Sequence, residues 1–175
     1  MMHNYTILSG KEVSSHVYKN LQDRVEYLLK NNIQPGLAAV LVGENPASKI
    51  YISMKTKMFY KLGLKTETFT LPAECSQNEL IQVIEKINND STFHGILVQL
   101  PLPNHIDSKS IINSICPKKD VDGFHPENAG LLSIGSPRFI PCTPKGVMRI
   151  FEHYNIDLNG KHVVVLGRKI GRAHV

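Results

Sequence analysis

Cysteine is scarce in this sequence, and no two cysteines lie close together. The 175 residues contain three, Cys75, Cys116 and Cys142, without a CxxC pair. A disulfide framework or a zinc knuckle needs more numerous or more closely spaced cysteines, so we expect reduced, structural thiols. The eight histidines are also dispersed, and none stands at ligand spacing from another. We therefore predict no metal site.

Long apolar runs are absent as well. No hydrophobic stretch approaches the roughly 20 residues that a membrane-spanning helix needs. The N-terminal segment MMHNYTILSG has neither the charged part nor the long apolar part of a secretory signal. We expect a cytoplasmic protein without a membrane partner, and an organelle lumen is the alternative location.

Blocks of like charge are also missing. The net charge is +5 and the isoelectric point about 9.1, yet the lysines are scattered along the chain. A nucleic-acid-binding tail would show a run of about five or six basic residues. There is no aromatic and basic motif of the kind that reads single strands. We predict no nucleic-acid partner, and the basic balance fits an anionic small molecule drawn toward a cleft.

What the sequence does contain is an alternation of helix and strand patterns. Apolar or alternating segments predict strands at 37–43, 66–71 and 94–100. Capping boxes at Ser9 with Glu12 and at Ser76 with Glu79 predict two helix starts. Further helices are predicted over 47–64 and 108–114. Strands that alternate with helices indicate an α/β fold, here a three-layer domain around a mostly parallel sheet.

A second unit is predicted to begin near residue 143. Long irregular stretches after Leu100 are typical of functional segments. Thr143 can then cap a helix that has Pro144 in its first position and runs to about Tyr154. The segment 161–168, KHVVVLGR, resembles the first strand of a Rossmann-like nucleotide-binding fold. We expect domains at 1–142 and 143–168. Residues 169–175 resemble a translated sequencing adapter and are expected to be a non-native tail, with a genuine short C-terminus as the alternative.

The segment 47–64 carries the first candidate site. Helical spacing places Ser48, Tyr51 and Lys55 on one face. A solvated surface is the alternative, because Lys57 and Lys61 continue the charge along the helix. Short-chain dehydrogenases also have a tyrosine and a lysine four positions apart, but there the pair follows the nucleotide-binding strands. Here the pair precedes the one such strand, and no GxGxxG is present.

Three later segments add candidates. Gln99 ends a buried strand, where open α/β sheets bind ligands. In KKDVDGF, Asp120 and Asp122 precede Gly123, and for Asp120 an Asx-turn with a glycine at positive φ is the favoured interpretation. In PCTPKG, Cys142 is expected in the core and the Thr143 hydroxyl at a helix N-cap.

Together these segments resemble the bifunctional methylenetetrahydrofolate dehydrogenase/methenyltetrahydrofolate cyclohydrolase family. The similarity covers nearly all of residues 5–168 and rests on VGENPASKIYISMKTK, GILVQLPLP, KKDVDGFHPENAG, PCTPKGV and KHVVVLGR. It implies a two-domain subunit with a folate cleft between the domains and NADP on the C-terminal one. It also implies oxidation of 5,10-methylenetetrahydrofolate and hydrolysis of the methenyl product to 10-formyltetrahydrofolate.

The resemblance also implies roles for individual residues. Lys55 is the implied acid/base group of the hydrolytic step. A lysine acts as a base only while its amine is neutral, a form that burial and a nearby cationic intermediate favour. Gln99 would hydrogen-bond Lys55, Tyr51 would lie against the pterin, and Asp122 would accept two hydrogen bonds from it. Ser48 would shape the cleft.

The cofactor segment departs from the family pattern. The family continues after the arginine with a serine and a glycine-containing turn, whereas this chain has Lys169. The implied cofactor-binding residues are Thr143, Gly167 and Arg168, with Arg168 pairing with the 2′-phosphate of NADP. We expect a truncated chain that lacks the dehydrogenase step, from a parent that is a homodimer in purine and amino-acid biosynthesis. The alternatives are a non-catalytic folate-binding fragment and a fragment of an amino-acid dehydrogenase without affinity for folates.

Overall fold

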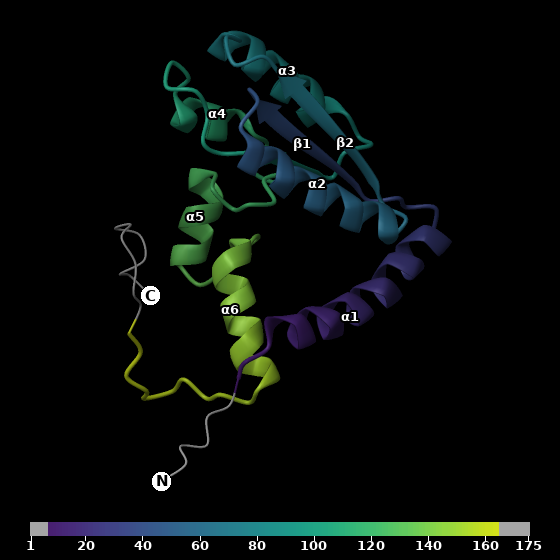
Figure 1. Cartoon of the computed structure of the whole chain (residues 1–175), viewed down its shortest axis with the longest axis vertical. Helices are drawn as coiled ribbons and strands as arrows, with labels where there is room; N and C mark the ends of the chain where they lie inside the picture. Colours follow the sequence, from purple (N-terminus) through teal and green to yellow (C-terminus); the bar gives the residue numbers. More distant parts are fainter. Residues whose placement is uncertain (1–6, 165–175) are drawn as a thin grey trace.

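A computed structural model describes residues 7–164 of the chain. Nine helices and strands follow one another within these residues (Figure 1). In chain order they are α1 (Gly10–Lys30), β1 (Gly36–Val42), α2 (Pro46–Lys61), β2 (Lys65–Leu71), α3 (Gln77–Asn89), β3 (Gly95–Val98), α4 (Ser108–Ser114), α5 (Pro126–Ser133) and α6 (Cys142–His153). The three strands predicted between residues 37 and 100 are all present, so the α/β prediction is confirmed.

The strands form one parallel sheet in the order β2-β1-β3. β1 lies in the centre, and every one of its residues is buried because strands cover both its edges and side chains cover both its faces. A short extended segment continues the sheet beyond β3. The Ile96 amide donates to the Lys119 carbonyl at 2.7 Å, and Ile96 forms an isolated parallel bridge with Asp120. The loop after Asp120 therefore begins at the edge where β3 ends.

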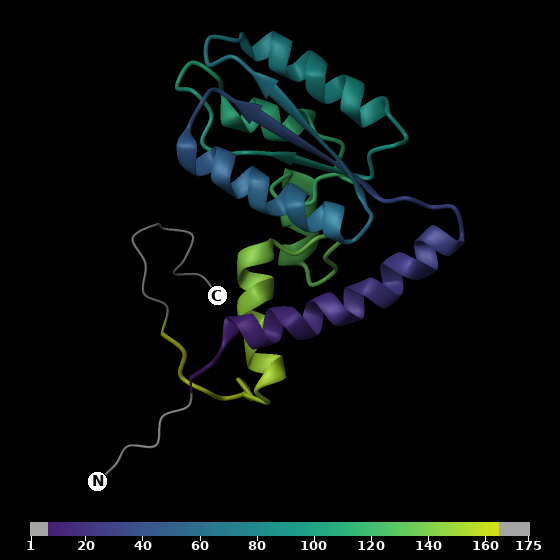
Figure 2. The same ribbon diagram turned by 45° about the vertical axis from the view of Figure 1, so that its right-hand side comes forward.

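Helices cover both faces of the sheet, which confirms the predicted three layers. Side chains of β1 alternate between the faces. Ala39 and Leu41 pack against Ile52 of α2. On the other face, the larger core cluster joins Val40 to Leu80 of α3 and residues of α4. Figure 2 shows α2 and α3 on opposite sides of the strands.

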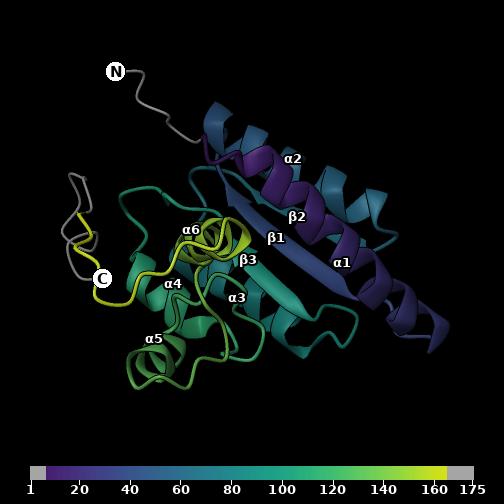
Figure 3. The same cartoon turned by 90° about the horizontal axis from the view of Figure 1, so that it is seen from below.

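The two predicted capping boxes have different outcomes. At α3 the box is complete: the Glu79 amide donates to Ser76 Oγ at 3.2 Å, and the Ser76 amide donates to Glu79 Oε2 at 2.7 Å. At α1 the Glu12 amide donates to Ser9 Oγ, but the Ser9 amide donates to the Tyr154 hydroxyl at 2.8 Å instead of to Glu12. That tyrosine follows α6, so a long-range contact replaces the local one and ties the start of α1 to the end of α6 (Figure 3).

The C-terminal part differs from prediction in three respects. α6 begins at Cys142 with Pro141 as its N-cap, so Thr143 lies inside the first turn and makes no side-chain cap. Cys142 is exposed rather than in the core. Residues 161–164 form no strand, and the remainder of the expected strand lies outside the described residues. A strand needs a hydrogen-bonded neighbour, and within 7–164 none pairs with 161–164.

Helix α5 was not predicted. Its sequence, PENAGLLS, contains a proline and a glycine, which usually interrupt helices. Pro126 occupies the first turn, where a missing amide hydrogen has no cost. The His125 side chain accepts a hydrogen bond from the Glu127 amide at 3.1 Å and so caps the helix. None of the helices within residues 7–164 combines the length and apolarity needed to cross a membrane.

We expect the core between the sheet and α3 to carry much of the stability. Leu80 is 0% exposed, whereas Ile134 is 76% exposed. Leu80→Ala should lower the free energy of unfolding by about 3 kcal/mol, because it removes buried methyl groups and leaves a cavity. Ile134→Ala should change it by less than about 0.5 kcal/mol. Denaturant unfolding of both variants tests this, and equal effects would contradict the assigned core.

Candidate functional site

Helix α2 presents the first group of candidate residues. The Asn45 side chain caps the helix by accepting from the Ser48 amide at 3.1 Å. Ile52 anchors the helix to the sheet, and Ser48 is buried beside it. Lys55 is half-buried, and Tyr51 is 62% exposed. The three predicted site residues thus share a helix but differ in burial, and Tyr51 offers an uncovered ring at the surface.

The two lysines that follow Lys55 on this helix lie in a different environment. Lys57 and Lys61 are both exposed. Neither takes part in a hydrogen bond or an ion pair among the contacts of residues 7–164. They match the solvated surface that the sequence suggested for them, and Lys55 is distinguished by its partial burial.

Gln99 lies directly after β3, at the carboxyl end of the sheet. Its amide donates to the Val40 carbonyl at 2.9 Å, which continues the pairing with β1. Its side chain is half-buried, and Nε2 donates to the Leu100 carbonyl at 2.7 Å. The hydrogen bond expected between Gln99 and Lys55 is not among those of the described residues. The local carbonyl occupies the side-chain donor in this conformation.

Asp120 has a structural role. It is only 2% exposed. Its Oδ1 accepts from the Gly123 amide at 3.1 Å, and its Oδ2 accepts from the His125 amide at 2.8 Å. Gly123 has φ +71°, a conformation that favours glycine. The glycine at positive φ and the structural role predicted for Asp120 are therefore confirmed. The carboxylate binds the amides three and five residues on, rather than two residues on as in an Asx-turn.

Asp122 lies in the same turn but in a different environment. It is half-buried, and burial raises the pKa of its carboxyl group. The positive charge of Lys55 lowers that pKa, and the negative charge of Asp120 raises it. A cation on α2 thus acts on a carboxylate from the loop beyond β3. These two groups are far apart in sequence, and the charge of one affects the pKa of the other.

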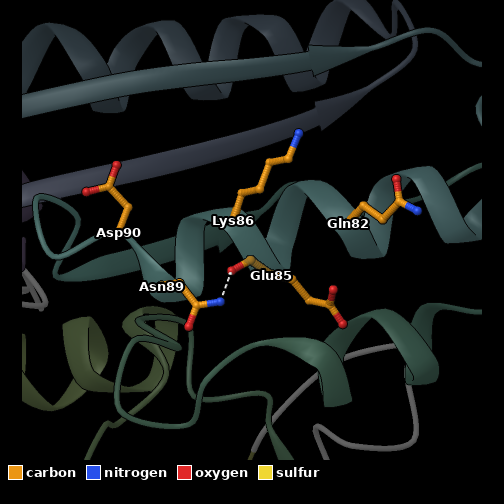
Figure 4. A pocket seen from close by; sticks show the side chains of 5 residues that line it. All are labelled: Gln82, Glu85, Lys86, Asn89 and Asp90. Atoms are coloured by element: carbon orange, nitrogen blue, oxygen red, sulfur yellow. Dashed lines mark hydrogen bonds between the residues drawn. The ribbon is translucent and has the colours of Figure 1, made fainter.

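Two surface hollows lie away from these residues. Figure 4 shows one along α3, lined by Gln82, Glu85, Lys86, Asn89 and Asp90. Another lies by residues 32–34 and 91–94, at the end of the sheet where the strands begin. Neither includes a residue of the predicted site. In residues 7–164, no group of three histidine, cysteine or acidic side chains is arranged to hold a metal.

The predicted cofactor residues are only partly described. Thr143 is exposed on the first turn of α6. Gly167 and Arg168 lie outside the described residues, as does the expected tail at 169–175. Of the three residues expected to contact NADP, the structure therefore describes Thr143 alone.

Two family models match this chain. The catalytic domain of tetrahydrofolate dehydrogenase/cyclohydrolase matches residues 8–122, and the NAD(P)-binding domain of the same family matches 141–173. The chain belongs to the tetrahydrofolate dehydrogenase/cyclohydrolase family. The fold and the order of its motifs agree with that membership.

Individual relatives agree with the family assignment. The bifunctional protein FolD of Enterococcus faecalis is 51% identical over 163 residues, which are 93% of this chain and 58% of that protein. The crystal structure of the FolD enzyme from Campylobacter jejuni has a TM-score of 0.90 at 44% identity, over 94% of this chain and 58% of that one. The Trypanosoma brucei enzyme, solved with NADP and an inhibitor, has a TM-score of 0.90 at 33% identity, over 96% and 58%. The chain thus spans less than two thirds of the length of these relatives.

Two residues near the site were missed in the sequence. Asn128 of α5 is 0% exposed, and its Nδ2 donates to Asp120 Oδ2 at 2.9 Å. Arg138 donates from Nη1 to Asn128 Oδ1 at 2.9 Å. The one available signal for Asn128 was its place in the motif KKDVDGFHPENAG. Arg138 lies outside every motif, so only the fold reveals its contact.

The raised pKa of Asp122 predicts a specific pH dependence of stability. Because the folded state holds this proton more tightly than the unfolded state, the stabilising contribution is full at low pH and is lost as pH rises through the folded-state pKa. Asp122→Asn should therefore be more stable than the parent chain at neutral pH. The difference should shrink in acid. Denaturant unfolding across this pH range measures it.

Asp107 provides a control of opposite sign. Hydrogen bonds from Ser110 and from the Lys109 amide lower the pKa of the Asp107 carboxyl group. Its stabilising contribution is present at neutral pH and is lost as pH falls through the lowered pKa. Asp107→Asn should thus be less stable than the parent at neutral pH, with a deficit that fades in acid. The same sign for both variants would show that Asp122 is not held in an unfavourable charge environment.

Proposed function

We propose that this chain is the folate-binding catalytic part of a methylenetetrahydrofolate dehydrogenase/methenyltetrahydrofolate cyclohydrolase, with Lys55 as the acid/base group of the hydrolytic step. One observation carries the proposal: Asp122 is half-buried in the loop that begins at the Ile96–Asp120 bridge on the sheet edge, and the positive charge of Lys55 on α2 lowers the pKa of its carboxyl group. A cation and a carboxylate near the carboxyl edge of a parallel sheet are suited to a ligand with both a reactive centre and a polar ring.

The substrate would be held mainly by Asp122 and Tyr51. The ionised carboxylate would accept hydrogen bonds from a ring N–H and the amino group of the pterin, a charge-assisted contact at two points. The exposed ring of Tyr51 has room for the flat pterin and aminobenzoyl system on its surface. Ser48, buried one turn earlier on α2, would shape the cleft wall. Gln99 would turn from the Leu100 carbonyl toward Lys55 when substrate binds.

Lys55 would move protons in the hydrolysis. As a neutral amine it would take a proton from water while the oxygen adds to the cationic methenyl carbon. The resulting ammonium would then give its proton to N5 as the bond between that carbon and N5 breaks. Loss of the hydroxyl proton to solvent forms the formyl group on N10. One water is consumed and one proton is released overall.

The hydride step needs residues beyond these. NADP is the proposed cofactor, supported by the match of 141–173 to the NAD(P)-binding domain. The residues described from 143 to 164 do not form a dinucleotide cradle, because 161–164 belong to no strand and Thr143 lies on an exposed turn. We therefore assign no part of the hydride transfer to them. We further propose domain boundaries at 1–142 and 143–168 and a non-native tail at 169–175. The full-length parent would be a cytoplasmic homodimer that serves purine and amino-acid biosynthesis.

A cyclohydrolase assay on the 175-residue chain tests the role of Lys55. Lys55→Ala should reduce the hydrolysis of methenyltetrahydrofolate by about a hundredfold or more, because proton transfer would pass to water. Binding of tetrahydrofolate, measured as a shift in melting temperature, should persist. Lys57→Ala is the matched control on the same helix and should retain activity. Equal loss of binding and turnover in Lys55→Ala would argue against a catalytic role, and a parent chain that binds but never turns over would favour the non-catalytic fragment.

A further inference from the structure

A series of hydrogen-bonded polar side chains starts in the turn that carries Asp122. It begins at Asp120 and passes through the side chain of Asn128. Both amide hydrogens of Asn128 are used, because Nδ2 donates to Asp120 Oδ2 and to the Pro117 carbonyl, each at 2.9 Å. Its oxygen accepts from Arg138. A fully buried amide with every hydrogen-bonding atom satisfied has one orientation, so the groups on either side of it are fixed.

This hydrogen-bonded series ends at a cation near the surface. Arg138 lies at the surface with 31% of its side chain exposed, and its second guanidinium nitrogen pairs with Glu127 Oε1 at 2.7 Å. The buried charge of Asp120 has no direct ion pair among the contacts of residues 7–164. It is stabilised by three N–H donors and, through the polarised amide of Asn128, by the guanidinium. The cation and the anion are therefore linked through one side chain.

Asp120 also fixes the segment that carries Asp122. Its carboxylate accepts from the amides of Gly123 and His125, both of which follow Asp122 in the loop. Its own backbone is bridged to Ile96 of β3. Asp122 is thus enclosed between a sheet contact on one side and two carboxylate contacts on the other. A loop constrained at both ends gives a side chain little freedom of direction.

We propose that Asp120, Asn128 and Arg138 are positioning residues for Asp122, whose carboxylate they hold in the direction and charge state that a pterin requires. This inference rests on the proposed function, since it takes Asp122 as the group that binds the pterin. It adds a hydrogen-bonded network of three residues, drawn from the turn, helix α5 and the loop after it, to the residues already proposed for the site. Asp120 acts on Asp122 through its own charge, whereas Arg138 acts through Asn128 and Asp120 and carries the opposite charge. Their effects are therefore separable.

The pH profile of tetrahydrofolate binding tests the proposal. The carboxylate of Asp122 must be ionised to accept both hydrogen bonds, so affinity falls as pH drops through its pKa. The charged groups that act on it are Lys55 from α2 and Asp120 from its own loop. Asp120→Asn removes a negative charge and should move the midpoint to lower pH. Arg138→Met removes the compensating positive charge and should move the midpoint to higher pH.

The affinity at neutral pH gives a second readout. Arg138→Met should bind tetrahydrofolate about tenfold more weakly, because the amide that orients Asp120 loses its partner. Two matched controls should bind like the parent chain. Glu127→Gln breaks the outer ion pair but leaves the contact with Asn128, and Arg149→Met removes an exposed arginine that pairs with Glu152 on its own helix. A purely structural role would weaken binding without moving the two pH midpoints in opposite directions.

Asp122→Asn separates this inference from the function it rests on. If Asp122→Asn binds tetrahydrofolate as well as the parent chain, Asp122 does not grip the pterin and the proposed function is wrong. If Asp122→Asn loses binding while Asp120→Asn and Arg138→Met keep the parental midpoint, the positioning role is wrong. If a variant fails to fold, carbon-13 NMR of the carboxyl groups in the parent chain gives an independent test. In the parent chain without folate, Asp122 should titrate above an ordinary aspartate, and an ordinary titration would overturn the inference.

Discussion

The pairing of β3 with its two neighbours is the constraint on which the candidate site depends. Gln99 follows β3 and remains bonded to β1 through Val40. On the other side, Ile96 bonds to the segment that contains Asp120. Because all these segments run parallel, their carboxyl ends meet at one edge, and α2 starts from the same edge after β1. Residues from three distant parts of the chain are thereby brought together.

Two aspartates in one short motif show how the backbone assigns different chemistry to the same side chain. Asp120 turns inward, and its carboxylate is occupied by backbone and amide donors. Asp122, two positions later, keeps its oxygens free of hydrogen bonds among those of residues 7–164, and burial raises the pKa of its carboxyl group. Because three N–H groups already donate to the Asp120 carboxylate, that carboxylate is part of the scaffold. The Asp122 carboxylate lacks such donors and is available to a ligand.

The predictable parts of this fold are those that local patterns determine. β1 is apolar on both faces, and Ser76 with Glu79 forms a complete capping box, so a window of a few residues was enough for each. The failures occur where long-range contacts decide. The Ser9 amide binds Tyr154 rather than Glu12, and Asn128 is buried because Asp120 and Pro117 lie across from it. The placement of Ser48, Tyr51 and Lys55 on one helix followed from local pattern, whereas the side-chain direction of Gln99 depended on a neighbouring carbonyl.

The absence of a direct contact between Lys55 and Asp122 is itself informative. No hydrogen bond or ion pair joins these side chains among those of residues 7–164, although the charge of one lowers the pKa of the other. A closed ion pair would occupy the donors of the ammonium and the oxygens of the carboxylate, and breaking a buried pair would be costly. Because Lys55 and Asp122 interact electrostatically without direct contact, both side chains remain free for a ligand that bridges them. The same separation lets Asp120, held in place by Asn128, influence the charge state of Asp122 without competing for its oxygens.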